Sequence, residues 1–217
     1  MENTAEKIKG LEAQLDALKK SLDAPPITPV ATAPKPDDLL KLDFGCGKNK
    51  KEGFKGVDIR AFEGVDFVLN IAEDHWPWPD DSVDEAHCSH FIEHLRWPER
   101  VHFFNELGRV MKKGAKATII WPHWCGDRYW GDPTHQQPMS PFALYYLNRE
   151  WRKANAPHAD YDSNTVHFWH EYTCDFDNVI SYSLHPALNG RNQEFVGWAM
   201  QFYKEAAQDV MATLQKR

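Results

Sequence analysis

The sequence lacks several features that would point to whole classes of protein. Its four cysteines lie far apart without a CxxC pair, which argues against a disulfide framework and a cysteine zinc site. No apolar stretch approaches the ~20 residues of a membrane span, and the charged first residues carry no apolar signal-peptide core. No run of Lys and Arg stands out and the net charge is -7, which argues against general nucleic-acid binding. We therefore expect a soluble protein of the cytoplasm with reduced thiols.

An N-terminal arm and a spacer precede the main domain. Residues 2–23 are predicted to form one helix, because apolar residues recur at spacings of 3, 4, 3 and 4, which is the repeat of a coiled coil; they are Ile8, Leu11, Leu15, Leu18 and Leu22. We favour homo-oligomer formation through residues 2–23 of this arm (residues 1–23) over a helix docked on its own domain. Residues 24–38 contain five prolines and are predicted to form an extended linker.

From residue 39 to 217 the pattern indicates a single α/β domain. Short apolar runs predict strands near 39–44, 55–59, 65–70, 84–88, 116–121, 177–184 and 208–216. A helix is predicted near 98–112, with Pro98 in its first turn and Gly114 just beyond its end. Strands that alternate with helices or loops imply a mostly parallel sheet.

A glycine turn follows the first predicted strand. Gly45 and Gly47 let the backbone turn sharply and approach a ligand closely. The next strand ends at Asp58, whose carboxylate is placed to accept both hydroxyls of a ribose. The third glycine of a dinucleotide fingerprint is replaced by Lys50, and the acid follows too soon for that motif. A nucleoside cofactor without a pyrophosphate therefore fits better.

Four segments resemble class I S-adenosylmethionine (SAM)-dependent methyltransferases of the subgroup called type 11, and they occur in the order of that family. They are similar to its first glycine motif, to the loop before its fourth strand, to the segment after that strand and to the helix before its fifth strand; they are residues 42–47, 76–84, 89–95 and 106–114. The short gap between glycine turn and acid also resembles a subgroup of predicted methyltransferases of surface-polysaccharide and phage genes.

The resemblance implies a fold and a cofactor site. The fold would be a doubly wound, Rossmann-like seven-stranded sheet of order 3-2-1-4-5-7-6. Asp43 and the glycine turn would hold the amino-acid end of SAM, Asp58 the ribose, and the residues near 70 the adenine. The implied cofactor residues are Asp43, Gly45, Cys46, Gly47, Asp58, Ile59, Asn70, Ile71 and Ser89. Asn70 departs from the family, which commonly has Asp there.

Three histidines are candidates for a catalytic base. His90 follows the fourth strand, beside Ser89, where ligands of such sheets bind. His123 and His135 lie in a long segment, residues 123–173, which we predict to form a lid that selects the acceptor. Most aromatic residues of this segment are predicted to pack in a core of their own. Ser140 is predicted to cap a helix that starts at Pro141.

The sequence therefore predicts a SAM-dependent methyltransferase that releases S-adenosylhomocysteine, with a small molecule or a glycan as acceptor. One alternative is an inactive SAM-binding scaffold tethered through its arm. Another is a zinc hydrolase, because His90, Glu93 and His94 spell the HxxEH motif of inverted zinc peptidases. That motif belongs on a long helix, whereas these residues follow a predicted strand, so we expect no metal site.

Overall fold

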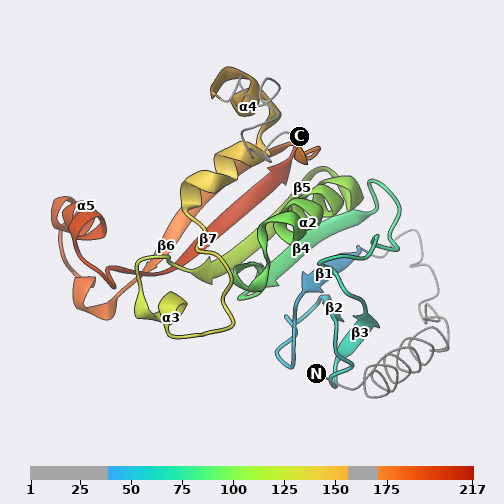
Figure 1. Cartoon of the computed structure of the whole chain (residues 1–217), viewed down its shortest axis with the longest axis horizontal. Coiled ribbons are helices and arrows are strands. Elements are labelled where there is room, and N and C mark those ends of the chain that lie inside the picture. The colour runs from blue at the N-terminus through green and yellow to red at the C-terminus, as the bar shows by residue number, and fades with distance from the viewer. Residues whose placement is uncertain (1–38, 156–170) are drawn as a thin grey trace, which may run out of the picture. The chain divides into compact units, whose positions relative to one another are not determined.

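The computed structural model of the chain describes residues 39–155 and 171–217. Its centre is one seven-stranded sheet of order β3-β2-β1-β4-β5-β7-β6 (Figure 1). The strands are β1 (Lys41–Phe44), β2 (Lys55–Asp58), β3 (Val65–Val68), β4 (Val83–Ser89), β5 (Met111–Pro122), β6 (Phe176–Leu184) and β7 (Ala207–Lys216). The predicted strand order is confirmed, and every predicted strand is present with small shifts at its ends.

The first five strands run parallel, and β7 pairs antiparallel with both β5 and β6. In parallel strands the carboxyl ends meet at one edge of the sheet. The turn after β1, Asp58 at the end of β2 and Ser89 at the end of β4 therefore share that edge. The antiparallel pairing of Pro122 with Asp209 brings the start of β7 to the same edge.

The main crossover helix is α2 (Trp97–Val110), which connects β4 to β5 and lies over the sheet in Figure 1. Pro98 stands in its first turn, as predicted. Residues 45–54, between β1 and β2, contain no helix, which confirms that this connection is too short for a dinucleotide motif. The sequence predicted a doubly wound sheet, in which helices join successive strands. This is wrong for β1, β2 and β3, because turns rather than helices join these three strands.

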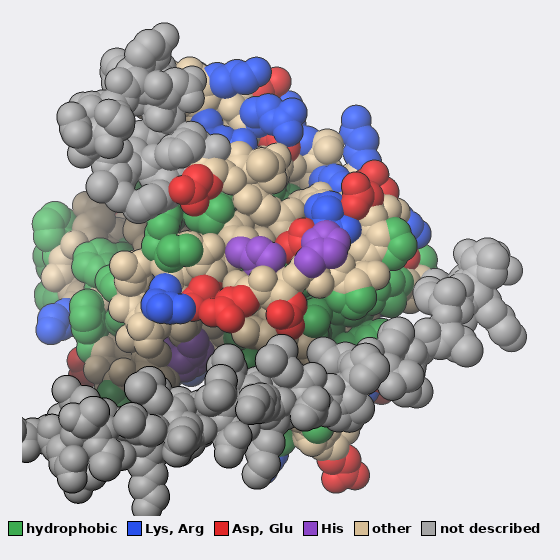
Figure 2. Space-filling model, turned by 45° about the vertical axis from the view of Figure 1, so that its right-hand side comes forward, with side chains coloured by type: hydrophobic (Ala, Val, Ile, Leu, Met, Phe, Trp, Pro, Cys, Tyr) green, Lys and Arg blue, Asp and Glu red, His purple; other side chains and the backbone are tan. Residues whose placement is uncertain are grey.

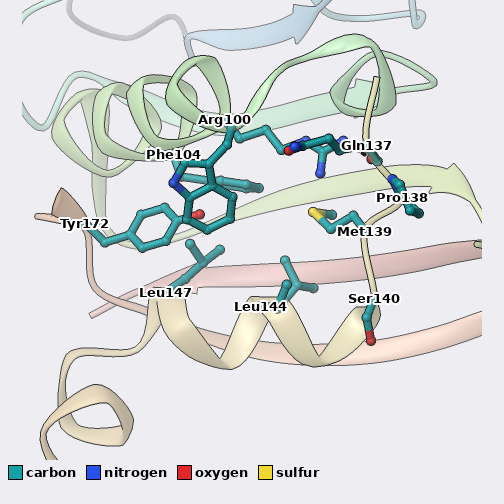
Figure 3. A pocket seen from close by; sticks show the side chains of 11 residues that line it. Arg100, Phe104, Gln137, Pro138, Met139, Ser140, Leu144, Leu147 and Tyr172 are labelled. Atoms are coloured by element: carbon teal, nitrogen blue, oxygen red, sulfur yellow. Dashed lines mark hydrogen bonds between the residues drawn. The ribbon is translucent and has the colours of Figure 1, made fainter. Parts of the chain in front are cut away.

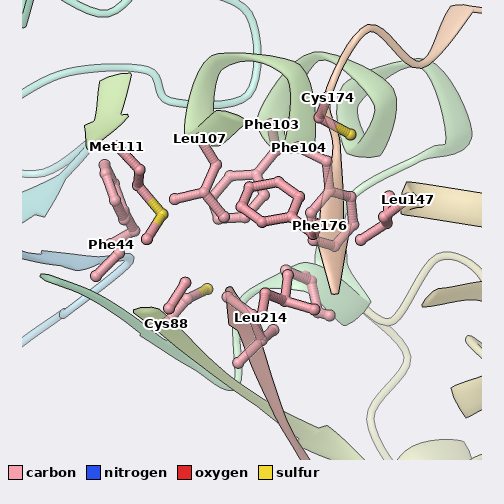
Figure 4. Packing of buried hydrophobic residues seen from close by; sticks show 14 of the residues in the cluster. Phe44, Cys88, Phe103, Phe104, Leu107, Met111, Leu147, Cys174, Phe176 and Leu214 are labelled. Atoms are coloured by element: carbon pink, nitrogen blue, oxygen red, sulfur yellow. The ribbon is translucent and has the colours of Figure 1, made fainter. Parts of the chain in front are cut away.

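The core lies between α2 and the sheet, where aromatic and aliphatic side chains from both interlock (Figure 4). Phe44 of β1 stacks on Trp76 at 4.4 Å between ring centroids and meets Phe103 of α2 edge to face. Each such side chain, when fully buried, contributes roughly 1.5–3 kcal/mol to stability. This packing fixes the end of β1, from which the glycine turn begins.

The segment after β5 folds into several short elements. They are α3 (Asp127–Trp130), the 3-10 helix η2 (Pro141–Leu147) and α4 (Arg149–Asn155). The side chain of Ser140 accepts a hydrogen bond from Phe142 N, so the predicted cap is confirmed. Tyr129 is buried, whereas Trp124 and Trp130 are exposed, so these two tryptophans are exceptions to the expectation that most aromatics of this segment form a core.

Helix α5 (Gln193–Phe202), between β6 and β7, was not predicted from the sequence. Its N-cap is Asn192, whose side chain accepts from Phe195 N at 2.8 Å. An N-cap asparagine followed by Glu194 is a recognisable helix start. The short 3-10 helices η1 (Ile92–His94) and η5 (Pro186–Leu188) complete the described elements.

Three predictions fall outside the described residues: the helical arm, the proline-rich linker, and the part of the predicted lid that spans residues 156–170. In the described part of the chain, no helix combines the length and the apolar character needed to cross a membrane.

Candidate functional site

The glycine turn after β1 adopts the backbone that its residues permit. Gly45 has φ +67° and Gly47 has φ +53°, a region that residues with a side chain rarely enter. A Cβ atom on Gly45 would lie 2.6 Å from the ring of Phe91, whereas one on Gly47 would meet no atom within 4 Å. Gly45 therefore allows close packing inside the protein, and Gly47 leaves its backbone open to a ligand.

Asp58 lies directly against this turn. Gly47 N donates a hydrogen bond to Asp58 Oδ2 at 2.8 Å, and Arg60 N donates to Oδ1 at 3.0 Å. Gly45 N also donates to the carbonyl of Val57 at 2.8 Å, which ties the turn to β2. The two features that the sequence placed in one cofactor site thus come together.

Asp43 is buried and both its oxygens have partners inside the protein. Oδ2 accepts from Lys51 N at 2.7 Å, and Oδ1 lies 2.7 Å from Nδ1 of His87. His87 was not predicted from the sequence as part of this site; the parallel register of β1 and β4 sets it beside Asp43. These contacts hold the two ends of the loop that contains the glycine turn close together. Asp43 therefore stabilises the conformation of the site from inside the protein.

Cys46 is buried in the glycine turn, where it is influenced by the charges of both carboxylates of the site. Burial, together with the charges of Asp43 and Asp58, raises the pKa of its thiol to about 11. The thiol is therefore protonated at neutral pH, and a thiolate nucleophile is not available at this position.

The residues expected near the adenine differ in accessibility. Ile59 is 59% exposed beside Asp58, so its side chain is free for a ligand to cover. Ile71 is buried, and its carbonyl accepts from Trp76 Nε1 at 3.1 Å. The amide of Asn70 donates to Glu73 Oε2 at 3.2 Å and accepts from Ala72 N.

At the end of β4, Ser89 and His90 lie next to a carboxylate from β7. Ser89 Oγ is 3.0 Å from His90 Nδ1, and His90 Nε2 is 3.4 Å from Asp209 Oδ1. The other oxygen of Asp209 accepts from Arg128 at 2.7 Å. His90 adopts φ +54°, which is uncommon for a residue with a side chain and is typical of functional positions. Sequence reasoning missed Asp209, which comes from more than a hundred residues further along the chain.

His135 lies beside His94 rather than beside His90. The ring centroids of His94 and His135 are 4.8 Å apart, and Glu93 completes a group whose ligand atoms all lie within 4.8 Å of one another. Burial raises the pKa of Glu93 to about 7 and lowers that of His94. His94 belongs to the three-residue helix η1 and not to a long helix, so the arrangement of the inverted zinc peptidases is absent from this segment.

His123, the third candidate base, lies apart from the other two histidines and lines a cavity. It is buried, its Nδ1 lies 2.9 Å from Cys125 Sγ, and burial lowers its pKa. The cavity has a volume of about 710 Å³ between the end of β5, η2, β6 and α5, with Trp124 and Tyr182 among its walls. Its aromatic lining is typical of a site for a small organic molecule.

A smaller cavity of about 310 Å³ lies between α2 and η2 (Figure 3). Tyr172, Leu144 and Leu147 line it, and Arg100 reaches across it toward Gln137. Arg100 donates to the carbonyls of Ile92 and Gln137. It thereby holds the segment after His135 against η1.

The face of the molecule in Figure 2 carries Lys and Arg side chains interspersed with Asp and Glu. An arrangement of both signs on one face creates no strong field of a single sign.

These features define a Rossmann-like fold with an open glycine turn and a carboxylate at the carboxyl edge of its parallel strands. Residues 46–119 match the family model described as a methyltransferase domain. The match and the strand order support a class I methyltransferase, and they indicate SAM as the cofactor.

One solved structure supports this fold, and a second is similar at a lower score. A SAM-dependent methyltransferase from Archaeoglobus fulgidus is 22% identical, with a TM-score of 0.57 over 83% of this chain and 87% of that chain. One from Mesorhizobium loti is 10% identical, with a TM-score of 0.48 over 85% of this chain and 94% of that chain. No curated protein matched the sequence.

Proposed function

We propose that this protein transfers the methyl group of SAM to an O, N or C atom of a small-molecule or glycan acceptor. The observation that carries the proposal is the hydrogen bond between Gly47 N and Asp58 Oδ2 at 2.8 Å. It joins an open glycine backbone to a carboxylate at the end of the second strand, which is the arrangement that a nucleoside with a free ribose requires.

The described residues fit the cofactor. Gly47 leaves space for a ligand against the backbone, Asp58 supplies acceptors for ribose hydroxyls, and exposed Ile59 supplies an apolar contact for a base. When bound, SAM supplies a methyl group on a positively charged sulfur, which is a good leaving group. The protein's part is to align the acceptor, to exclude water and to accept a proton where the acceptor loses one.

We propose His90 as the residue that accepts this proton. It lies at the carboxyl end of β4 next to Ser89, its side chain is 43% exposed, and Asp209 faces its Nε2. A carboxylate stabilises the protonated imidazole that would form. His123 is buried against Cys125, which favours a role in shaping the neighbouring cavity.

The cavity lined by His123, Trp124 and Tyr182 is our proposed acceptor site. Aromatic faces suit the apolar faces of sugars as well as flat rings. This cavity opens beside the carboxyl end of β5, the strand next to β4 in the sheet.

The test is calorimetric titration of the full-length protein with S-adenosylhomocysteine, beside Asp58→Asn and Asp58→Ala. Wild type is expected to bind, and the alanine variant to bind at least tenfold more weakly, because hydrogen bonds to a charged group contribute about 1.5–3 kcal/mol each. Asp58→Asn keeps one acceptor and is expected to lie between the two.

A matched control is Asp66→Asn. Asp66 accepts from Gly56 N at 2.8 Å, as Asp58 does from Gly47 N, and also pairs with Lys50. The Asp66→Asn variant is expected to be less stable than wild type, without a comparable loss of affinity for S-adenosylhomocysteine. Equal losses in the Asp58 and Asp66 variants would mean that Asp58 acts only by holding the turn. Wild type that binds no S-adenosylhomocysteine would overturn the proposed function, and binding without transfer to any acceptor would favour the inactive scaffold.

A further inference from the structure

Two histidines and a glutamate from separate segments converge just after β4. Glu93 and His94 belong to η1, and His135 comes from the loop after α3. Gln136 N donates to the carbonyl of Glu93 at 2.9 Å, which fastens the loop to η1. One ligand atom from each of the three side chains lies within 4.8 Å of the other two.

Hydrogen bonds fix which nitrogen of each histidine is free. His135 Nδ1 is 2.6 Å from the carbonyl of Tyr129, so it must carry the proton. Thr134 Oγ1 donates to Asp132 at 2.6 Å and therefore accepts from His94 Nδ1 at 3.1 Å. In the neutral form of each ring, Nε2 is then the nitrogen with the free lone pair, and Asp132 Oδ2 lies 3.8 Å from that of His135. A histidine that binds a metal through one ring nitrogen usually donates a hydrogen bond from the other nitrogen to a carbonyl, a carboxylate or water. Here His135 donates to a carbonyl, and His94 donates to a threonine that is itself bonded to a carboxylate.

Glu93 provides an independent observation. Its side chain is 1% exposed, and neither carboxylate oxygen has a hydrogen-bond partner among the described residues. The guanidinium of Arg100 is not its partner, because it donates to the carbonyls of Ile92 and Gln137. A buried carboxylate without a partner is costly, and a bound cation beside the two imidazoles would satisfy it.

We propose that Glu93, His94 and His135 bind one divalent transition-metal ion of the zinc class. Two imidazoles and one carboxylate are a ligand set that zinc accepts, and three protein ligands leave a coordination position open. Zinc ligands in a tetrahedron lie about 3.3 Å apart, so the three side chains need to close by up to about 1.5 Å from their 4.8 Å limit.

The site lies at the carboxyl edge of the sheet, where the proposed methyl transfer occurs. Metal binding at this cluster does not depend on the proposed function.

The experiment uses full-length protein that has been stripped with a chelator and dialysed. Zinc is added, and the metal content per chain and the affinity are measured by elemental analysis and calorimetry; cobalt provides a visible spectrum of the same site. Wild type is expected to bind one zinc per chain. His94→Ala and His135→Ala are expected to lose at least tenfold in affinity and the cobalt spectrum, and Glu93→Gln to weaken both.

His102→Ala is the matched control, because His102 also has one ring nitrogen on a carbonyl, that of Asp74 at 2.8 Å. It lies outside the cluster and is expected to bind zinc like wild type. Each variant is also titrated with S-adenosylhomocysteine, and retained binding shows that the fold is intact.

Wild type without stoichiometric zinc would overturn the proposal and leave Glu93 as a protonated buried acid. Variants of His94 and His135 that bind zinc as His102→Ala does would overturn it as well. Zinc binding in a protein that binds no S-adenosylhomocysteine would retain the metal site and reject the methyltransferase function instead.

Discussion

Gly45 and Gly47 both adopt a positive φ, but their surroundings differ. The ring of Phe91 occupies the space beside Gly45, whereas the space beside Gly47 is empty. We expect Gly45→Ala to lower the free energy of unfolding by roughly 2–4 kcal/mol, through backbone strain and overpacking together. Gly47→Ala is expected to cost only about 1 kcal/mol, from strain alone. Urea unfolding of the two variants measures the difference.

A second variant isolates the clash. Phe91→Ala removes the ring that the new methyl group of Gly45→Ala meets. We therefore expect Gly45→Ala to destabilise the Phe91→Ala protein less than it destabilises wild type. Equal destabilisation by Gly45→Ala and Gly47→Ala would show that the contact with Phe91 contributes nothing.

The single residues of the site were predictable where local sequence determines them. Gly45 and Gly47 follow the end of β1 and Asp58 is the last residue of β2, and these positions alone place them at one edge of the sheet. The partners of Asp43 and His90 were not predictable in the same way, because His87 and Asp209 reach them through the register of neighbouring strands. Register depends on packing across the whole sheet rather than on neighbouring residues.

At the level of elements, α2 holds the loop before β4 through Glu106 and Arg109, which pair with each other, and Arg109 also pairs with Asp80 of the loop at 2.9 Å. Glu106 accepts from Trp76 N at 2.7 Å and from Arg109, whose guanidinium also donates to the carbonyls of Trp76 and Trp78. Burial alone would raise the pKa of Glu106, but the hydrogen bonds from Arg109 and Trp76 N outweigh burial and lower it. The loop thereby places both tryptophans in the core.

We expect Glu106→Gln to destabilise the protein by about 1–3 kcal/mol at pH 7, because charged hydrogen bonds are lost in a buried place. The pKa of Glu106 is lower in the folded than in the unfolded protein, whose ordinary value is 4.5. Its contribution is therefore complete above about pH 4.5 and is lost as the pH falls further. Urea unfolding at pH 7 and in this acidic range should show the gap between wild type and variant shrinking.

Glu150→Gln is the control for this prediction. Glu150 pairs with Arg217 at 3.2 Å, but its side chain is 75% exposed, and exposed ion pairs contribute little. If Glu150→Gln lost as much stability as Glu106→Gln, the assignment of the effect to the buried pair would be contradicted. A stability difference between wild type and Glu106→Gln that does not change with pH would contradict it as well.

For the whole molecule, the alternation of strands and turns predicted the sheet, and the family resemblance supplied its strand order. The surface after β5 was less predictable. The same residue types, Trp and Tyr, serve as core at Tyr129 and as exposed surface at Trp130. Periodicity does not separate these two uses in short irregular elements. The missed helix α5 shows the same difficulty, since its side chains are mostly exposed.

α5 presents an apolar face that the described residues leave uncovered. Phe195, Trp198 and Phe202 recur at spacings of three and four on one side of the helix, and all three are exposed. Clustered exposed aromatics indicate an interaction surface. The coiled coil predicted for residues 1–23 spans fewer than three heptads, so we expect it to be weak by itself. We therefore propose that a second copy of the chain covers this face and adds to the association of the arms.

Sedimentation of the full-length protein tests this proposal. Wild type should form an oligomer, and Leu15→Lys in the arm and Trp198→Glu on α5 should each weaken it at least tenfold, because each buried apolar side chain contributes roughly 1.5–3 kcal/mol. Leu39→Lys places the same kind of change on a leucine that is 67% exposed elsewhere, and it should leave the mass unchanged. A wild-type protein that sediments as a single chain would reject both surfaces. Dissociation by Leu15→Lys alone would restrict the interface to the arm and leave the face of α5 free for another partner.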